Sequence, residues 1–372
     1  MSSDNNNKVV SKALPHTIKK FELIERYVKE WVYKLMNYDK CQKLVYIDCM
    51  SNSGEYYDES GKTILGTAVR VAECLHKASL QYHSKEIHIY LNDIDERKVE
   101  HLKDLLPKEE KNYKLHITCM DAGSLLKNIG PLLMNSKETH TLLVYDPYTA
   151  SIDWDAVMPF FNTWGEVIIN HMVSDSIRAV PVAKRPDTIR KYEQTYRTTF
   201  DKLLPFGTNK NAYEARIEEI ISNMRAQNCR DFYIAAFPFF SRKNAVVYNL
   251  IHYTNSRAGF RLFKKSAWKT FDGKSSGKDT HGTENQLTFN LFGSGESKTV
   301  TDEDCYYIKD IADYVQSAFN GKKEVPLDII WALLDEHPIF PYDGFRNEIK
   351  KELKQNYAAI EKKGLIDFQH RG

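Results

Sequence analysis

The first 255 residues alternate between short apolar runs and longer segments whose apolar positions recur at helical spacing. Five strand-length runs separated by helix-length segments are typical of a parallel sheet with crossover helices on both faces. Two further runs lie only a few residues apart and predict an antiparallel hairpin. The pattern therefore predicts a doubly wound, Rossmann-like α/β sheet of seven strands, formed by residues 43–49, 86–93, 114–121, 140–147, 165–172, 231–240 and 244–254.

Helical spacing of apolar residues also predicts the elements between these strands. Helices are expected over residues 16–38, 64–79, 154–164 and 213–228, and two more are expected to begin near residues 95 and 122. Residues 173–207 show no clean period, and we interpret them as an insertion.

The last hundred residues have a different organisation. Residues 273–298 are rich in Gly, Ser, Thr and Lys, which favours a flexible linker. Three helices (304–319, 327–336 and 344–362) and a short strand near residue 366 are expected after it, a pattern typical of a small winged-helix-like unit. The predicted organisation is an α/β domain over 1–272, a linker over 273–300 and a winged-helix-like unit over 301–372.

Composition excludes some classes of protein. The net charge of +2 leaves no overall field that would attract nucleic acid, so local clusters of charge must be considered. The six cysteines are scattered without metal-ligand spacing, as expected of core residues in a reducing compartment. The polar start, MSSDNNNK, lacks the apolar segment of a signal peptide, and no run approaches about 18 apolar residues. We therefore expect a cytoplasmic protein with no membrane partner.

Four of the strand-like runs end in an acidic residue or lead into one: Asp48, Asp93, Asp121 and Asp146. Ligands of doubly wound sheets bind beyond the carboxyl ends of the strands, where these carboxylates are expected to lie. A repeated carboxylate favours a ligand rich in hydroxyl and amino donors. The sequence thus predicts a nucleoside cofactor, S-adenosylmethionine in preference to a nucleotide triphosphate.

Each of these positions has an expected role in that site. Asp48 and Gly54 bracket the loop after the first strand, where the methionine part of the cofactor would approach the backbone. Asn52 stands where a common Asp-x-Phe-x-Gly-x-Gly pattern has its first glycine, and asparagine tolerates the left-handed conformation. Asp93 can accept from the ribose hydroxyls and Asp121 from the adenine amino group. Taken singly, each Asp is as well explained as a helix cap or a loop residue.

The catalytic candidates are Asp146, Pro147 and Tyr148, which end the fourth strand. Methyltransferases that act on the amino groups of adenine or cytosine carry Asp/Asn-Pro-Pro-aromatic here, so that the acceptor amine donates to the carboxylate and the ring stacks on the flipped base. This chain has a single proline, and Thr149 follows the tyrosine. The alternative interpretation is a rigid strand-to-helix turn with a buried tyrosine.

Two segments combine basic and aromatic residues, as nucleic-acid surfaces do. Residues 178–202 and 257–278 contain seven Lys or Arg each. The candidates for contact with nucleic acid or substrate are Arg178, Arg185, Arg190, Lys264 and Lys265. An ordinary solvated surface is the alternative.

With these motifs assembled, the chain resembles the three-Cys-motif partner proteins (TcmP) over most of its length. The resemblance rests on YIDCMSNSGEY, LNDIDERKVEHL, VYDPYTASIDW, YNLIHYTNSRAGFRLF and the closing GLIDF. It implies a fold like that of class I S-adenosylmethionine-dependent methyltransferases and a partner protein that carries the three-Cys motif. Members usually have Phe-Ala-Gly-x-Gly after the first Asp and glycine after Asp-Pro-Tyr, whereas this chain has MSNSG and Thr149.

Three hypotheses remain from the sequence. The first is a methyltransferase acting on nucleic acid in a phage-defence or mobile-element context, with no metal required. The second is a non-catalytic module of the same fold that binds a partner protein or nucleic acid. A Mg²⁺-dependent nuclease is the third, and it is disfavoured because strand-end spacing does not make carboxylates converge on one ion.

Overall fold

The computed structural model describes residues 9–134, 136, 138–161, 164–226, 232–278 and 305–370. Most of the predicted linker, 273–300, lies outside these residues. Among the helices described, none is both long enough and apolar enough to cross a membrane.

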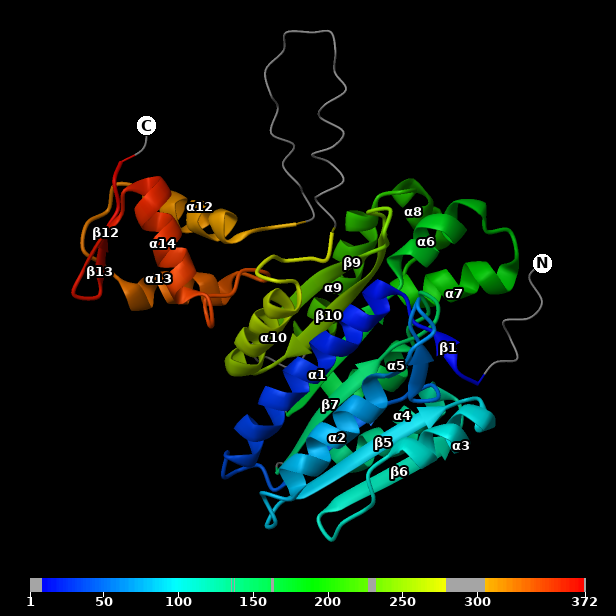
Figure 1. Cartoon of the computed structure of the whole chain (residues 1–372). Helices are drawn as coiled ribbons and strands as arrows, with labels where there is room; N and C mark the ends of the chain where they lie inside the picture. The colour runs from blue at the N-terminus through cyan, green and yellow to red at the C-terminus, as the bar shows by residue number, and fades with distance from the viewer. Residues whose placement is uncertain are drawn as a thin grey trace.

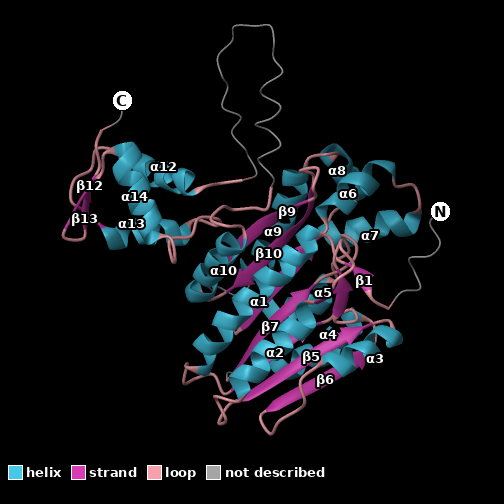
Figure 2. Ribbon diagram, viewed as in Figure 1, coloured by secondary structure: helices cyan, strands magenta, loops and turns pink. Residues whose placement is uncertain are grey.

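A seven-stranded sheet forms the centre of the molecule, in the order β6-β5-β2-β7-β8-β10-β9 (Figures 1 and 2). The first five of these strands are parallel, β10 runs antiparallel to β8, and β9 runs antiparallel to β10. The predicted doubly wound sheet with a final antiparallel hairpin is confirmed. Its strands are β2 (Lys43–Asp48), β5 (Glu86–Asp93), β6 (Tyr113–Cys119), β7 (Thr139–Tyr145), β8 (Gly165–His171), β9 (Tyr233–Phe240) and β10 (Val246–Thr254).

The sheet is buried on both faces because successive residues of a strand point to opposite sides. In β2, Leu44 and Tyr46 belong to one apolar cluster, whereas Val45 and Ile47 belong to the other. The first cluster is completed by α1 (Pro15–Met36), α2 (Thr67–Ser79), α3 (Glu96–Leu105) and α10 (Arg257–Thr270). The second is completed by α4 (Ala122–Met134), α5 (Trp154–Val157), α6 (Val173–Ala179), α7 (Pro186–Tyr196) and α9 (Lys210–Ala226).

Three expected boundaries were wrong. The helix expected from residue 64 begins at Thr67, because β4 (Thr63–Leu65) pairs with β3 (Glu55–Tyr57), which also pairs with β1 (Ser11–Lys12). The helix expected over 154–164 ends as α5 and continues as a 3₁₀ turn, because Pro159 has no N–H for an α-helical bond. The apparent insertion 173–207 contains α6, α7 and α8 (Phe200–Leu203), each too short to show a clear period.

The C-terminal segment contains α12 (Ile308–Phe319), β11 (Val325–Pro326), α13 (Leu327–Glu336), α14 (Arg346–Tyr357), β12 (Ile360–Lys362) and β13 (Leu365–Asp367). The last helix ends earlier than expected, because Ala358 adopts a left-handed conformation (φ 51°) and the β12–β13 hairpin follows. The winged-helix interpretation and the domain division stay predictions.

Candidate functional site

Three of the predicted carboxylates meet at the carboxyl ends of the parallel strands, the edge of the sheet at which the site lies. Asp48 and Asp93 are the last residues of β2 and β5, and Asp146 directly follows β7. Asp48 and Asp93 are each only 4% exposed. Burial, reinforced by the neighbouring Asp146, raises the pKa of Asp48 to about 7. The edge therefore concentrates negative charge, which favours a ligand that donates hydrogen bonds or carries positive charge.

The loop after β2 has the conformation that its sequence predicts. Asn52 and Gly54 have φ values of 58° and 76°, both in the left-handed region. The Asn52 side chain accepts from the Ser53 N–H at 2.7 Å, and the Asn52 N–H donates to Asp93 at 3.0 Å. A Cβ on Gly54 would lie 2.6 Å from Leu102 Cδ1 and 2.7 Å from Val69 Cγ2. Asparagine therefore replaces one glycine of the usual loop, whereas the second glycine is required by packing.

Asp93 and Asp121 already have partners from the backbone. Asp93 accepts from the N–H groups of Asn52 and Asp95, each at 3.0 Å, so both oxygens hold one bond and keep further lone pairs. Asp121 is exposed and accepts from the Ser124 N–H at 2.9 Å, at the start of α4. Asp121 thus caps a helix, which is the alternative that its sequence position left open.

Asp146 is paired with a residue that the sequence analysis missed. The ammonium of Lys20, on α1, donates to Asp146 Oδ2, and the side-chain amide of Asn170 donates to Oδ1. Lys20 is only 7% exposed. The sequence did indicate that Lys20 is buried, because it lies on the same helical stripe as the apolar Ile24 and Tyr27. The buried Asn170 Oδ1 has no hydrogen-bond partner among the described residues.

Tyr148 is 67% exposed, so the interpretation as a buried tyrosine in a rigid turn is wrong. Its hydroxyl accepts from the Asn52 amide at 2.7 Å and from the Lys98 ammonium at 3.4 Å. The ring thus connects the end of β7 to the loop after β2 while a large part of its surface stays accessible.

A cavity of about 230 Å³ lies beside these groups, lined in part by Lys20, Asn52, Asp146, Pro147, Tyr148, Asn170 and Tyr248. Pockets for drug-sized ligands usually measure about 300–1,000 Å³. In this conformation the cavity has room for a small group, such as an amine and its substituents.

The first basic segment lies near the same edge. Arg178 on α6, Arg185 just before α7 and Arg190 on α7 are all exposed. No carboxylate partner is found for them among the described residues. Asp175 of α6 accepts from the Ala150 N–H at 2.9 Å, which ties this segment to the chain just after Tyr148.

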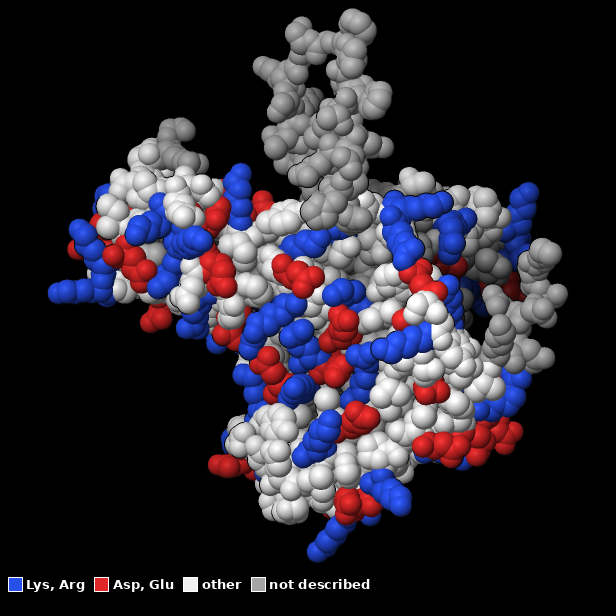
Figure 3. Space-filling view, viewed as in Figure 1, with Lys and Arg blue, Asp and Glu red and all other residues white. Residues whose placement is uncertain are grey.

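The second basic segment corrects the sequence interpretation. Lys264 is 1% exposed and donates to the carbonyls of Leu334 at 2.9 Å and His337 at 2.7 Å, and burial lowers its pKa to about 7. Lys265 pairs with Glu30 of α1 at 2.7 Å. Both ammonium groups therefore hold α10 against its neighbours, so the prediction that Lys264 contacts nucleic acid is wrong, and Lys265 is committed to an ion pair. Elsewhere on the visible face, basic and acidic residues are mixed (Figure 3).

The structure was also searched for residues that could bind a metal ion. Within the described ranges no group of three or more His, Cys, Asp or Glu is arranged to hold a metal ion.

Comparison with known proteins gives structural neighbours only. No family model matches the chain, and no curated protein matches it in sequence. A Legionella pneumophila protein of the family DUF519 shares 11% identity and a TM-score of 0.40, over 68% of this chain and 92% of its own. The methyltransferase domain of a bacterial Hen1 protein shares 12% identity and a TM-score of 0.29, over 62% and 99%. Loganic acid methyltransferase, solved with S-adenosylhomocysteine, shares 8% identity and a TM-score of 0.28, over 64% and 94%.

The strand order and the antiparallel β10 described above define a Rossmann-like, doubly wound α/β fold.

Proposed function

We propose that this chain is an S-adenosylmethionine-dependent methyltransferase of the three-Cys-motif partner family that methylates an amino group of nucleic acid. One observation carries the proposal. Asp146 and Asn170 present oxygen acceptors at the ends of two adjacent strands, and an amine, that of Lys20, already donates to Asp146. The unpartnered Oδ1 of Asn170 adds an acceptor for a second N–H.

The residues at the edge of the sheet fit the cofactor. The left-handed Asn52 and Gly54 keep the loop after β2 close to the sheet. Asp48 and Asp93, each 4% exposed in this conformation, would offer carboxylate oxygens to hydroxyl or ammonium donors once the loop opens. Asp121, with one oxygen used as a helix cap, would contribute its second oxygen to the adenine amino group. The bound cofactor supplies an electrophilic methyl group.

The contribution of the protein is mainly to position the acceptor. Asp146 accepts an N–H of the acceptor amine and thereby fixes the direction of its nitrogen. Lys20 and Asn170 each use one acceptor position of Asp146, and a carboxylate has about four, so an acceptor amine can donate to Asp146 beside the Lys20 ammonium. The accessible ring of Tyr148 gives a face on which a base can stack.

A nucleic-acid acceptor is supported by the charge beside this edge. Arg178, Arg185 and Arg190 lie on the segment that follows β8, and phosphate groups pair with such exposed guanidinium groups. The rings and carboxylates of the site would then receive a base extruded from the strand.

Methyl transfer from isotope-labelled S-adenosylmethionine to single-stranded DNA, double-stranded DNA and RNA, detected by mass spectrometry, tests this function. Asp146→Asn is expected to lower transfer at least about 100-fold while the cofactor still binds. Asp155→Asn is the matched control, because Asp155 lies nearby in the sequence and pairs only at the surface with Arg197. Equal transfer by both variants would contradict the role of Asp146.

A second candidate is a non-catalytic module that binds the three-Cys-motif partner protein or nucleic acid. It is favoured by the fact that both oxygens of Asp146 are engaged by Lys20 and Asn170. Binding of nucleic acid or of the partner without any methyl transfer would support this alternative.

A further inference from the structure

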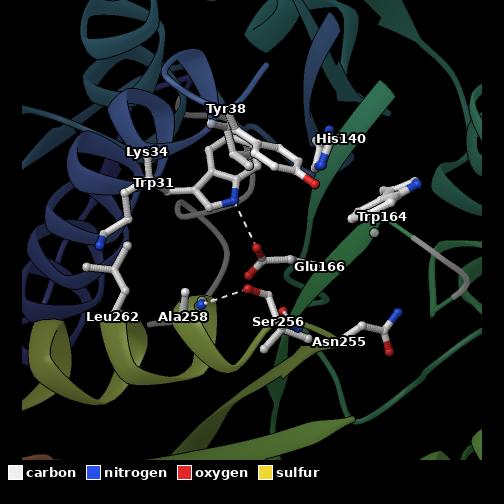
Figure 4. A pocket seen from close by; sticks show the side chains of 14 residues that line it. Trp31, Lys34, Tyr38, His140, Trp164, Glu166, Asn255, Ser256, Ala258 and Leu262 are labelled. Atoms are coloured by element: carbon white, nitrogen blue, oxygen red, sulfur yellow. Dashed lines mark hydrogen bonds between the residues drawn. The ribbon is translucent and has the colours of Figure 1, made fainter. Parts of the chain in front are cut away.

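A second cavity, of about 440 Å³, lies at the opposite ends of the strands, where β7 and β8 begin (Figure 4). α1 forms one wall and the start of α10 forms another. Asp48, Asp93 and Asp146, at the carboxyl ends of the strands, are not among its lining residues. Its volume falls within the range of about 300–1,000 Å³ that is usual for small-molecule sites.

Glu166 of β8 forms the floor of this cavity. Its Oε1 accepts from Trp31 Nε1 at 3.0 Å, and its Oε2 is contacted by the Tyr27 hydroxyl and by His252 Nε2 at 2.9 Å. No Lys or Arg pairs with Glu166 among the described residues. A carboxylate has about four acceptor positions. One position on Oε1 is therefore left for a donor from a ligand.

Aromatic side chains surround that acceptor. Trp164 and Tyr38, 37% and 38% exposed, stand at the mouth of the cavity, and Trp31 and His140 lie deeper. His140 stacks at a tilt on Trp164, with ring centroids 4.9 Å apart. Its buried Nδ1 has no hydrogen-bond partner within the described part of the chain. The cavity thus combines flat aromatic walls with one acceptor position on Glu166.

Lys34 of α1 also lines the cavity and is exposed. No carboxylate partner for its ammonium is found in the described ranges. A ligand with an N–H donor at one end and an anionic group at the other would satisfy Glu166 and Lys34 together.

We propose that this cavity binds a nucleotide whose base carries an exocyclic amino group. The base lies against the aromatic walls, its amino group donates to Glu166, and the phosphate faces Lys34. The inference is independent of the methyltransferase function, because the two sites lie at opposite ends of the strands.

Isothermal titration with matched pairs of monophosphates tests the proposal: cytidine against uridine, and adenosine against inosine. Within each pair the amino group is replaced by a carbonyl, and the adjacent ring nitrogen changes from an acceptor to an N–H donor. Because a carbonyl facing Glu166 repels it, the amino-bearing nucleotide of each pair is expected to bind at least about tenfold more tightly.

Substitutions at the mouth of the cavity locate the site without disturbing the core contacts of Glu166. Trp164→Leu and Lys34→Gln are each expected to weaken binding of cytidine monophosphate at least fivefold, whereas Lys103→Gln, at the surface of α3, leaves it unchanged. The proposal is overturned if millimolar nucleotides give no binding, if amino and carbonyl bases bind equally, or if Trp164→Leu binds like the wild type.

Discussion

The ammonium of Lys20 and the carboxylate of Asp146 form an ion pair between α1 and the end of β7, with side chains that are 9% and 27% exposed. Loss of one partner of a largely buried pair leaves the other charge without compensation. Lys20→Met is therefore expected to lower the free energy of unfolding by about 3 kcal/mol, measured by urea denaturation. Lys19→Met is the control, because the more exposed Lys19 forms a surface pair with Glu22 and one hydrogen bond to the Thr270 carbonyl, and it should cost about 1 kcal/mol or less. Equal costs would show that the ion pair does not stabilise the fold.

Gly54 is expected to be intolerant of a side chain. Gly54→Ala combines the left-handed φ of 76° with contacts of 2.6 and 2.7 Å to Leu102 and Val69. We expect a loss of about 3 kcal/mol in the free energy of unfolding, of which about 1 kcal/mol is conformational. Gly61→Ala isolates the conformational part, because Gly61 has φ 84° and open space around it. Similar losses in the two variants would mean that the packing of the loop against α2 and α3 is not tight.

Asp48 gives the fold a defined pH dependence. Its folded-state pKa of about 7 lies above the ordinary value of 3.8, so the folded protein binds the proton more tightly than the unfolded chain does. The stabilisation from this proton is complete below about pH 4 and is lost as the pH rises through about 7, at up to about 1.4 kcal/mol per pH unit.

Asp48→Asn removes this titration. We compare the free energy of unfolding of the variant with that of the wild type by urea denaturation. The difference is expected to favour the variant more at pH 8 than at pH 5. Asp58→Asn is a contrasting control, because hydrogen bonds from Ser60 and Lys62 lower the pKa of the exposed Asp58, so its effect has the opposite sign. A wild type and an Asp48→Asn variant with parallel pH profiles would exclude the raised pKa.

The three exposed arginines are expected to contact phosphate groups. Replacing Arg178, Arg185 and Arg190 together by Gln should reduce the slope of log K against log salt concentration by about 2–3, because each phosphate contact contributes about 0.7–0.9. The matched control replaces Lys77, Lys108 and Lys111, which are exposed near the beginnings of the strands. If the control reduces the slope as much, binding is a property of the general surface charge.

The fold was predictable because strands buried on both faces produce continuous apolar runs, as in residues 44–47 and 142–145. The loop conformation was also predictable, since Asn52 and Gly54 are residues that adopt positive φ. The pairing of Lys20 with Asp146 was not, because it joins residues 126 positions apart. Lys264 was misjudged for a similar reason: its carbonyl partners lie 70 and 73 positions away on the C-terminal segment. Composition alone does not distinguish a basic helix face that is exposed from one that is covered.

The claim that the ends of β2, β5 and β7 bind an adenosyl cofactor is tested most directly by titrating the full chain with S-adenosylhomocysteine in a calorimeter. We predict saturable binding of one ligand per chain, weakened at least tenfold by Asp93→Asn and unaffected by Trp164→Leu. No heat of binding at millimolar S-adenosylhomocysteine would contradict the account.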